Sequence, residues 1–183
     1  MKRFWFLTLV LFLSACSHTG TYKHSGSIHV EKSVAIGENL RANRYSDIYF
    51  APQPSEKDWE KLKAQGFTHV INLRSDEEYD EQKEKSKMES LKLNYTQVPI
   101  RANEELTKST VDLVTQSVMA HRKKGKTLIH CLTGQRAAFW AGAHFYQDHN
   151  QSADEALQTA HDLGLNNPHL VKTLKNFFSE NKK

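Results

Sequence analysis

The chain has 183 residues, of which 38% are hydrophobic and 25% are charged, and its formal net charge at pH 7 is +4. This length suits one domain with a single buried core, and the mixture of apolar and charged residues excludes a disordered or fibrous protein. The positive charge is mild and spread along the chain, so the composition argues against a nucleic-acid partner.

The amino terminus has the pattern of a bacterial export signal. Lys2 and Arg3 precede an apolar run over residues 4–13, which is too short to span a bilayer comfortably. The tetrad Leu13-Ser14-Ala15-Cys16 then resembles the lipobox that is cut before a diacylated cysteine. That resemblance implies a signal peptide over residues 1–15 and a lipid on Cys16 that holds the chain to a membrane. Because Ser17 follows Cys16, it also implies an outer-membrane lipoprotein that faces the periplasm. A plain signal peptide and a short buried helix are the alternatives.

Residues 16–40 are mostly polar and predict a lipidated tether, with the catalytic domain over residues 41–183. In that domain, short apolar runs predict strands over residues 48–50, 69–74, 93–100 and 126–130. Helical spacing predicts helices over residues 55–66, 106–122, 136–149, 153–163 and 168–178, and the charged run 75–87 predicts a loop leading into an exposed helix. Strands that alternate with helices predict an α/β fold, with a central, mostly parallel sheet flanked by helices.

Cys131 is the one thiol that remains if Cys16 carries a lipid. An unpaired cysteine is unusual in an oxidising compartment, although burial as a small apolar side chain would explain it. It lies in the segment His130-Cys131-Leu132-Thr133-Gly134-Gln135-Arg136, between a predicted strand and a predicted helix. The backbone N–H groups of such a loop and the positive end of the helix dipole favour a bound anion and the nucleophilic thiolate. Gly134 allows a tight curl, and Arg136 can donate two parallel hydrogen bonds to an oxyanion.

Residues 45–178 resemble the cysteine-dependent phosphatases, in particular the dual-specificity-like branch with bacterial β-lactamase-hydrolase-like members. The resemblance rests on Phe50-Ala51-Pro52-Gln53-Pro54-Ser55, on Val70-Ile71-Asn72-Leu73-Arg74 and on the segment that ends in Cys131. It implies the phosphatase fold, a phosphorylated protein or small molecule as substrate, and a phosphocysteine intermediate on Cys131. Arg136 would clamp the phosphoryl group. The backbone amides of four residues would cradle it: Leu132, Thr133, Gly134 and Gln135.

Two further roles follow from the same resemblance. Glu104 is the nearest equivalent of the acid that protonates the leaving alcohol, and Glu105 and then Asp112 are the alternatives. Glu104 and Glu105 are also typical of the first turn of a helix. His130 would steady the nucleophile at the substrate site, or point to the other side of its strand. The ten histidines form no metal-ligand pattern, so neither a metal nor a cofactor is predicted.

Two departures leave other functions open. The spacing is Cys-x4-Arg, where the phosphatases usually have Cys-x5-Arg, and Ala137 occupies the position of a hydroxyl that helps the thiolate leave. Cys-x-x-Gly-x-Arg is also the active loop of rhodanese sulfurtransferases, in which Cys131 would carry a persulfide. A lipoprotein of the same fold that binds an anion or a partner and turns over weakly is the third possibility.

Overall fold

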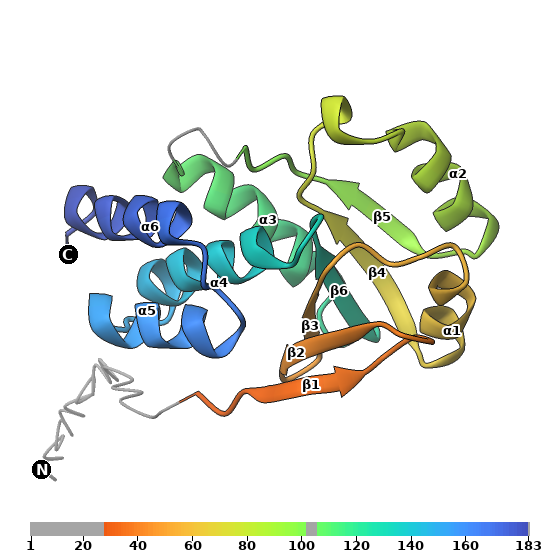
Figure 1. The fold of residues 1–183 in the computed structure, drawn as a ribbon, viewed down its shortest axis with the longest axis horizontal. Helices are drawn as coiled ribbons and strands as arrows, with labels where there is room; N and C mark the ends of the chain where they lie inside the picture. The colour runs from red at the N-terminus through yellow and green to blue at the C-terminus, as the bar shows by residue number, and fades with distance from the viewer. Residues whose placement is uncertain (1–27, 102–105, 183) are drawn as a thin grey trace, which may run out of the picture.

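The computed structural model describes residues 28–101 and 106–182, and six strands in this part of the chain form one sheet in the order β1-β2-β3-β6-β4-β5 (Figure 1). The strands are β1 (Glu31–Ala35), β2 (Arg41–Tyr45), β3 (Ile48–Ala51), β4 (Phe67–Asn72), β5 (Asn94–Gln97) and β6 (Lys126–His130). Strands β3, β6, β4 and β5 are parallel, whereas β1 and β2 are antiparallel additions at one side. The predicted α/β fold with a mostly parallel sheet is confirmed.

Helices cover both faces of the sheet, because side chains along each central strand alternate between two cores. Leu128 faces the core beneath α1 (Asp58–Ala64) and α2 (Glu81–Ser90). Ile129 faces the larger core on the other side. That core lies beneath four helices: α3 (Lys108–His121), α4 (Gln135–Asp148), α5 (Ala153–Asp162) and α6 (Pro168–Glu180). A short 3-10 helix, η1 (Asp76–Glu78), follows β4 at the edge where the parallel strands end.

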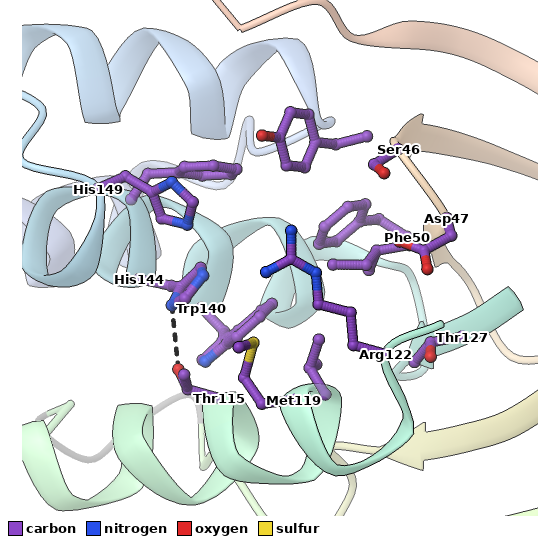
Figure 2. Close-up of a pocket in the computed structure, with 14 residues that line it drawn as sticks. Ser46, Asp47, Phe50, Thr115, Met119, Arg122, Thr127, Trp140, His144 and His149 are labelled. Atoms are coloured by element: carbon purple, nitrogen blue, oxygen red, sulfur yellow. Dashed lines mark hydrogen bonds between the residues drawn. The ribbon is translucent and has the colours of Figure 1, made fainter. Parts of the chain in front are cut away.

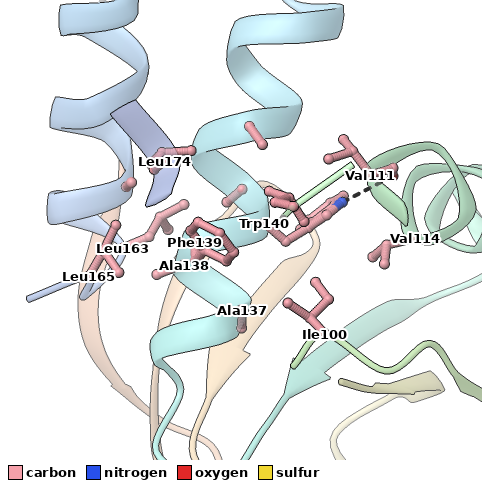
Figure 3. Packing of buried hydrophobic residues seen from close by; sticks show 14 of the residues in the cluster. Ile100, Val111, Val114, Ala137, Ala138, Phe139, Trp140, Leu163, Leu165 and Leu174 are labelled. Carbon is pink, nitrogen blue, oxygen red and sulfur yellow. Dashed lines mark hydrogen bonds between the residues drawn. The ribbon is translucent and has the colours of Figure 1, made fainter. Parts of the chain in front are cut away.

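Helix α4 is the centre of the larger core (Figure 3). Phe139 and Trp140 are each 1% exposed, and the indole N–H of Trp140 donates to the carbonyl of Val111 at 3.2 Å. A Cβ atom at Gly142 would lie only 2.7 Å from a methyl group of Leu174, so a larger residue would push α6 away from α4. This packing fixes the start of α4, and the Cys131 loop leads directly into that start.

The observed elements differ from the predicted ones mainly near the amino terminus. β1 lies within the segment predicted as a tether, and Ile36 and Leu40 are buried, so the described fold begins ahead of the predicted boundary at residue 41. β2 was not predicted, and α1 begins at Asp58 rather than at Ser55. The predicted signal peptide and Cys16 lie outside the described residues. Within the described residues, no helix is long and apolar enough to cross a membrane.

Two buried histidines are expected to make stability depend on pH. Burial lowers the pKa of His69 from 6.5 to about 3 and that of His144 to about 4. Both side chains stay neutral in the folded chain, whereas in the unfolded chain they bind a proton below pH 6.5. The contribution of the two histidines to the free energy of unfolding is therefore complete above pH 6.5. It is lost as the pH falls from 6.5 toward the pKa values of the folded state. Each histidine contributes a slope of up to about 1.4 kcal/mol per pH unit in that range.

Urea unfolding at pH 7 and at pH 5 measures this slope. We expect the free energy of unfolding to fall at pH 5, and we expect His69→Gln to lose part of that fall. The exposed His169 provides the control, since His169→Gln should leave the slope unchanged. Equal stability at the two pH values would contradict the assignment of neutral buried imidazoles.

Candidate functional site

The Cys131 loop joins β6 to α4 at the edge where the parallel strands end. Cys131 is a free thiol that is 1% exposed, and the backbone N–H of Gly134 points at its Sγ atom from 3.2 Å. Gly134 has a φ of +83°, and a Cβ atom there would lie 3.2 Å from the carbonyl carbon of Ala51. The glycine is therefore required both by backbone conformation and by the close approach of β3. The Gln53 N–H also donates to the Leu132 carbonyl at 3.2 Å, which holds the loop from the β3 side.

Arg136 is held by a carboxylate and by two backbone carbonyls. Its Nη1 and Nη2 atoms donate to the two carboxylate oxygens of Glu78 at 2.6 and 2.5 Å. Nη1 also donates to the carbonyls of Leu73 at 3.3 Å and Ile100 at 3.0 Å. The guanidinium also interacts with the side chain of Cys131, so it lies beside the thiol. The guanidinium is thus oriented before any ligand binds.

Glu78 was not predicted as a site residue. Its hydrogen bond with Arg136 lowers its pKa from 4.5 to about 2; hydrogen bonds from Ser75 add to this effect, while burial opposes it. Glu78 is therefore ionised at neutral pH and cannot serve as a proton donor. It acts by positioning Arg136.

A pocket of about 580 Å³ lies over the loop and is the space in which a substrate could sit. Leu132 is 55% exposed at its rim, which gives the entrance an apolar side chain. The side chain of Gln135 holds the loop to its surroundings, because its amide donates to the Gly164 carbonyl at 2.8 Å and its oxygen accepts from the N–H groups of Asn166 and Asn167. The pocket is lined by Ser75, Glu77, Glu78, Arg101, Leu132, Thr133, Gln135, Arg136, Asn167 and Leu170.

The prediction that His130 binds substrate needs correction. Its side chain is fully buried on the other face of the sheet, where it packs edge-on against Trp59 at 5.8 Å. Its Nε2 atom lies 3.2 Å from Oε1 of Glu84, although the two atoms are not aligned as a hydrogen bond. Alternation along β6 explains the outcome, because Cys131 and His130 must point to opposite faces.

Glu84 is a buried carboxylate at the centre of a hydrogen-bond network on this face of the sheet. It accepts hydrogen bonds from the side-chain amides of Gln53 at 2.7 Å and Asn72 at 2.8 Å. Burial opposes its ionisation, but the nearby His130 and the two amides outweigh burial and hold the pKa of Glu84 below its ordinary value. Gln53 in turn accepts from Arg74 at 2.9 Å. This network ties α2 and the segment after β3 to the strand that carries Cys131.

Removal of the Glu84 carboxylate is expected to loosen this support. Glu84→Ala removes one acceptor from the buried amide of Asn72 and one from the partly buried amide of Gln53, and an unsatisfied buried donor costs about 1–3 kcal/mol. We therefore expect a clear loss of stability in urea unfolding, whereas Glu89→Ala, at an exposed position on the same helix, should change it little. Equal effects of the two substitutions would contradict a supporting role for Glu84.

The predicted general acid, Glu104, lies outside the described residues. Among the described acids that line the pocket, Glu78 is committed to Arg136 and Glu77 pairs with Arg101 at 3.2 Å.

A second cavity, of about 80 Å³, lies at the other end of the sheet between α3 and α4 (Figure 2). Its walls include the aromatic side chains of Phe50 and Trp140, and Arg122 extends over it. Its lining contains neither Arg136 nor any residue of the Cys131 loop, whereas the larger pocket is lined by Leu132, Thr133, Gln135 and Arg136. We therefore take the pocket over the Cys131 loop as the candidate site.

Comparison with known proteins gives one family match and a set of similar folds. Residues 48–139 match the family model described as "Swiss Army Knife protein, DSP-PTPase phosphatase domain". A comparison with curated proteins found no match.

Three solved structures illustrate the similarity of the fold. The active form of Tk-PTP is 19% identical, with a TM-score of 0.61, and the match covers 72% of this chain and 91% of that one. A kinase-associated phosphatase whose catalytic-site cysteine is replaced by serine is 17% identical, with a TM-score of 0.63 and coverages of 85% and 97%. A cysteine-to-serine variant of TpbA from P. aeruginosa in complex with pTyr is 16% identical, with a TM-score of 0.59 and coverages of 75% and 81%. At these identities the likeness shows a shared fold.

Proposed function

The chain belongs to the DSP-PTPase family of cysteine-dependent phosphatases, and on this basis we propose that it hydrolyses phosphate monoesters through a phosphocysteine formed on Cys131. The observation that carries the proposal is the arrangement of the Cys131 loop beside the Arg136–Glu78 pair. It brings together a thiol, the backbone N–H of Gly134 and a fixed guanidinium, which suits the binding of an oxyanion. Family membership also favours the phosphatase over the rhodanese-type sulfurtransferase that the loop spacing left open.

In the proposed reaction, the Sγ thiolate of Cys131 attacks phosphorus and the bond from phosphorus to the leaving oxygen breaks. Arg136 and the amides of the loop stabilise the negative charge on the phosphoryl oxygens. The leaving oxygen takes a proton from a carboxylic acid, for which Glu104 remains the candidate. Water then attacks the phosphocysteine, the sulfur–phosphorus bond breaks, and the thiolate and inorganic phosphate are released.

We further propose that the enzyme acts in the bacterial cell envelope, as an outer-membrane lipoprotein held by a lipid on Cys16 and facing the periplasm. The leader and the Leu13-Ser14-Ala15-Cys16 tetrad support this location. Intact mass measurement of the protein from bacterial membranes tests it. We expect a chain that begins at a diacylated Cys16, and an unprocessed chain would contradict the anchor.

Turnover of a generic aryl phosphate by the purified protein tests the reaction class. We expect release of inorganic phosphate, and no thiocyanate when thiosulfate and cyanide are supplied instead. Formation of thiocyanate without release of phosphate would show that Cys131 transfers sulfur instead. Oxyanion binding without turnover of either substrate would indicate the third possibility, a binding lipoprotein of the same fold.

Glu104→Gln is expected to impair the protonation of the leaving group. The loss should be about a hundredfold or more for an alkyl phosphate, whose alkoxide is a poor leaving group, and much smaller for a nitrophenyl phosphate. The measurement is kcat for both substrates across pH, and Glu105→Gln is the matched control. Equal losses on both substrates, or a selective loss in Glu105→Gln, would exclude Glu104 as the acid.

A further inference from the structure

Lysine side chains gather at the end of the sheet where the parallel strands begin. Lys126 opens β6, and Lys123 and Lys124 precede it in the turn from α3. Further along this end, the Nζ atom of Lys63 donates to the carbonyl of Lys92, two residues before β5, at 3.0 Å. We call these five lysines, Lys63, Lys92, Lys123, Lys124 and Lys126, the basic edge.

The charge of the basic edge is largely uncompensated. Four of its lysines are exposed, and Lys126 is partly buried with its Nζ atom over the rings of Tyr49 and Phe67, 5.7 Å from each centroid. Within the described residues, no acid forms an ion pair with any of the five lysines. The acids that backbone contacts place beside it are Asp47, next to the start of β6, and Glu89, next to Lys92.

The opposite end of the sheet carries acids, and Glu77 and Glu78 among them are paired with Arg101 and Arg136. The segment after β4 carries Asp76, Glu77 and Glu78 in η1, and Glu81 opens α2. Glu77 and Glu78 line the pocket over the Cys131 loop. The lysines of the basic edge therefore lie at the end of the sheet opposite the catalytic pocket. An anionic surface would attract the basic edge.

The described chain enters the fold at the end of the sheet that carries the basic edge. Glu31 in β1 pairs with Arg44 in β2, and Tyr45 pairs with Ile48 at the start of β3. Val30 packs against the same core as Tyr45 and Ile48, so the segment that leads back toward Cys16 leaves the domain where the parallel strands begin. In Figure 1 the described chain begins below α5, and β1 then runs along the lower side of the sheet.

We propose that the basic edge docks on the anionic phospholipid head groups of the membrane that holds the chain, which leaves the Cys131 loop facing away from the bilayer. Lysines near such a surface each favour binding, and the attraction falls off within a Debye length. The position of the membrane rests on the proposed anchoring through Cys16, whereas the docking itself needs only the basic edge. The consequence is that the pocket receives substrates from the aqueous side.

Hydrogen exchange on vesicles tests this orientation. The full-length purified protein is mixed with phosphatidylcholine vesicles, and with vesicles in which about a third of the lipid is phosphatidylglycerol. We expect amides in residues 92–94 and 121–126 to exchange about fivefold more slowly on the anionic vesicles, and amides in residues 132–135 to be unaffected. Added salt should remove the difference.

Two charge-reversal variants make the test specific. Lys63→Glu/Lys92→Glu/Lys123→Glu should lose the protection, whereas Lys172→Glu/Lys175→Glu/Lys182→Glu, with the same change in net charge at other exposed positions, should retain it. Both should keep full aryl phosphatase activity, because none of these residues lines the pocket.

Each outcome is decisive. Equal exchange on both vesicles, loss of protection in both variants, or protection over residues 132–135 would overturn the proposal. Flotation of the protein with anionic vesicles but not with phosphatidylcholine vesicles would support docking of the basic edge and would contradict the lipid anchor on Cys16. Protection without phosphatase activity would support docking while removing the proposed reaction.

Discussion

Replacement of Cys131 by serine is expected to abolish turnover while preserving oxyanion binding. The hydroxyl of serine is a far weaker nucleophile than a thiolate in this position, so kcat for an aryl phosphate should fall by about four orders of magnitude or more. The loop amides and Arg136 are untouched by the substitution, so the affinity for inorganic phosphate should stay within a few-fold of that of the wild type. Initial rates and calorimetric titration measure the two quantities.

The control is Thr133→Ala, which alters an exposed side chain of the same loop but leaves its backbone in place. That variant should keep most of its activity. Residual turnover in Cys131→Ser within tenfold of the wild type would show that another group attacks phosphorus. Loss of phosphate binding would instead show that the substitution had disrupted the loop.

Arg136→Lys is expected to have the second largest effect. Lysine keeps the positive charge but cannot present two parallel donors to a phosphoryl group while it also binds Glu78. Loss of one such transition-state donor costs about a hundred- to a thousandfold in kcat, so a fall of this size is expected with a smaller change in KM. The measurement is steady-state kinetics on the same aryl phosphate.

Glu78→Gln tests whether the orientation of the Arg136 guanidinium matters in addition to its positive charge. Arg136 keeps its cation in this variant, but the glutamine side chain offers one oxygen acceptor in place of the two carboxylate oxygens that fix the direction of the guanidinium. The expected result is a fall in kcat of about tenfold, together with a loss of stability at pH 7 of no more than a few kcal/mol. An unchanged kcat would mean that the backbone contacts to Leu73 and Ile100 orient Arg136 without help.

The strand, loop and helix around Cys131 could be predicted because their signals are local. An apolar run before Cys131, a glycine at a left-handed position and helical spacing after Arg136 all lie within about 25 residues. The helix predicted over residues 106–122 rests on a similar local signal, because Val111, Val114 and Val118 recur at helical spacing and all three are buried in α3.

The partners of these residues could not be predicted, because they meet only in the folded chain. Glu78 and Glu84 lie in a run that is charged throughout, and nothing in that run shows which acid will face Arg136 or the Cys131 strand. A capping box of Ser75 and Glu78 was available as a signal for η1, but it predicts a turn rather than a contact. β2 was not predicted, for a related reason. Its residues are largely polar, only Ala42 is buried, and its pairing depends on β3.

Ala137 makes the reaction intermediate accessible to observation. It is fully buried and packs in the larger core, so no hydroxyl stands directly after Arg136 to help the thiolate leave. We therefore expect hydrolysis of the phosphocysteine to be slower than its formation, so that the intermediate accumulates during turnover.

Trapping that intermediate tests directly whether Cys131 is the nucleophile. The enzyme is mixed with excess aryl phosphate, quenched within the first turnovers, and digested for mass spectrometry. We expect one phosphoryl group on Cys131 in the wild type and none in Cys131→Ser. Multiple turnovers with Cys131 unmodified, or a phosphoryl group on a different residue, would contradict a phosphatase that works through this thiol.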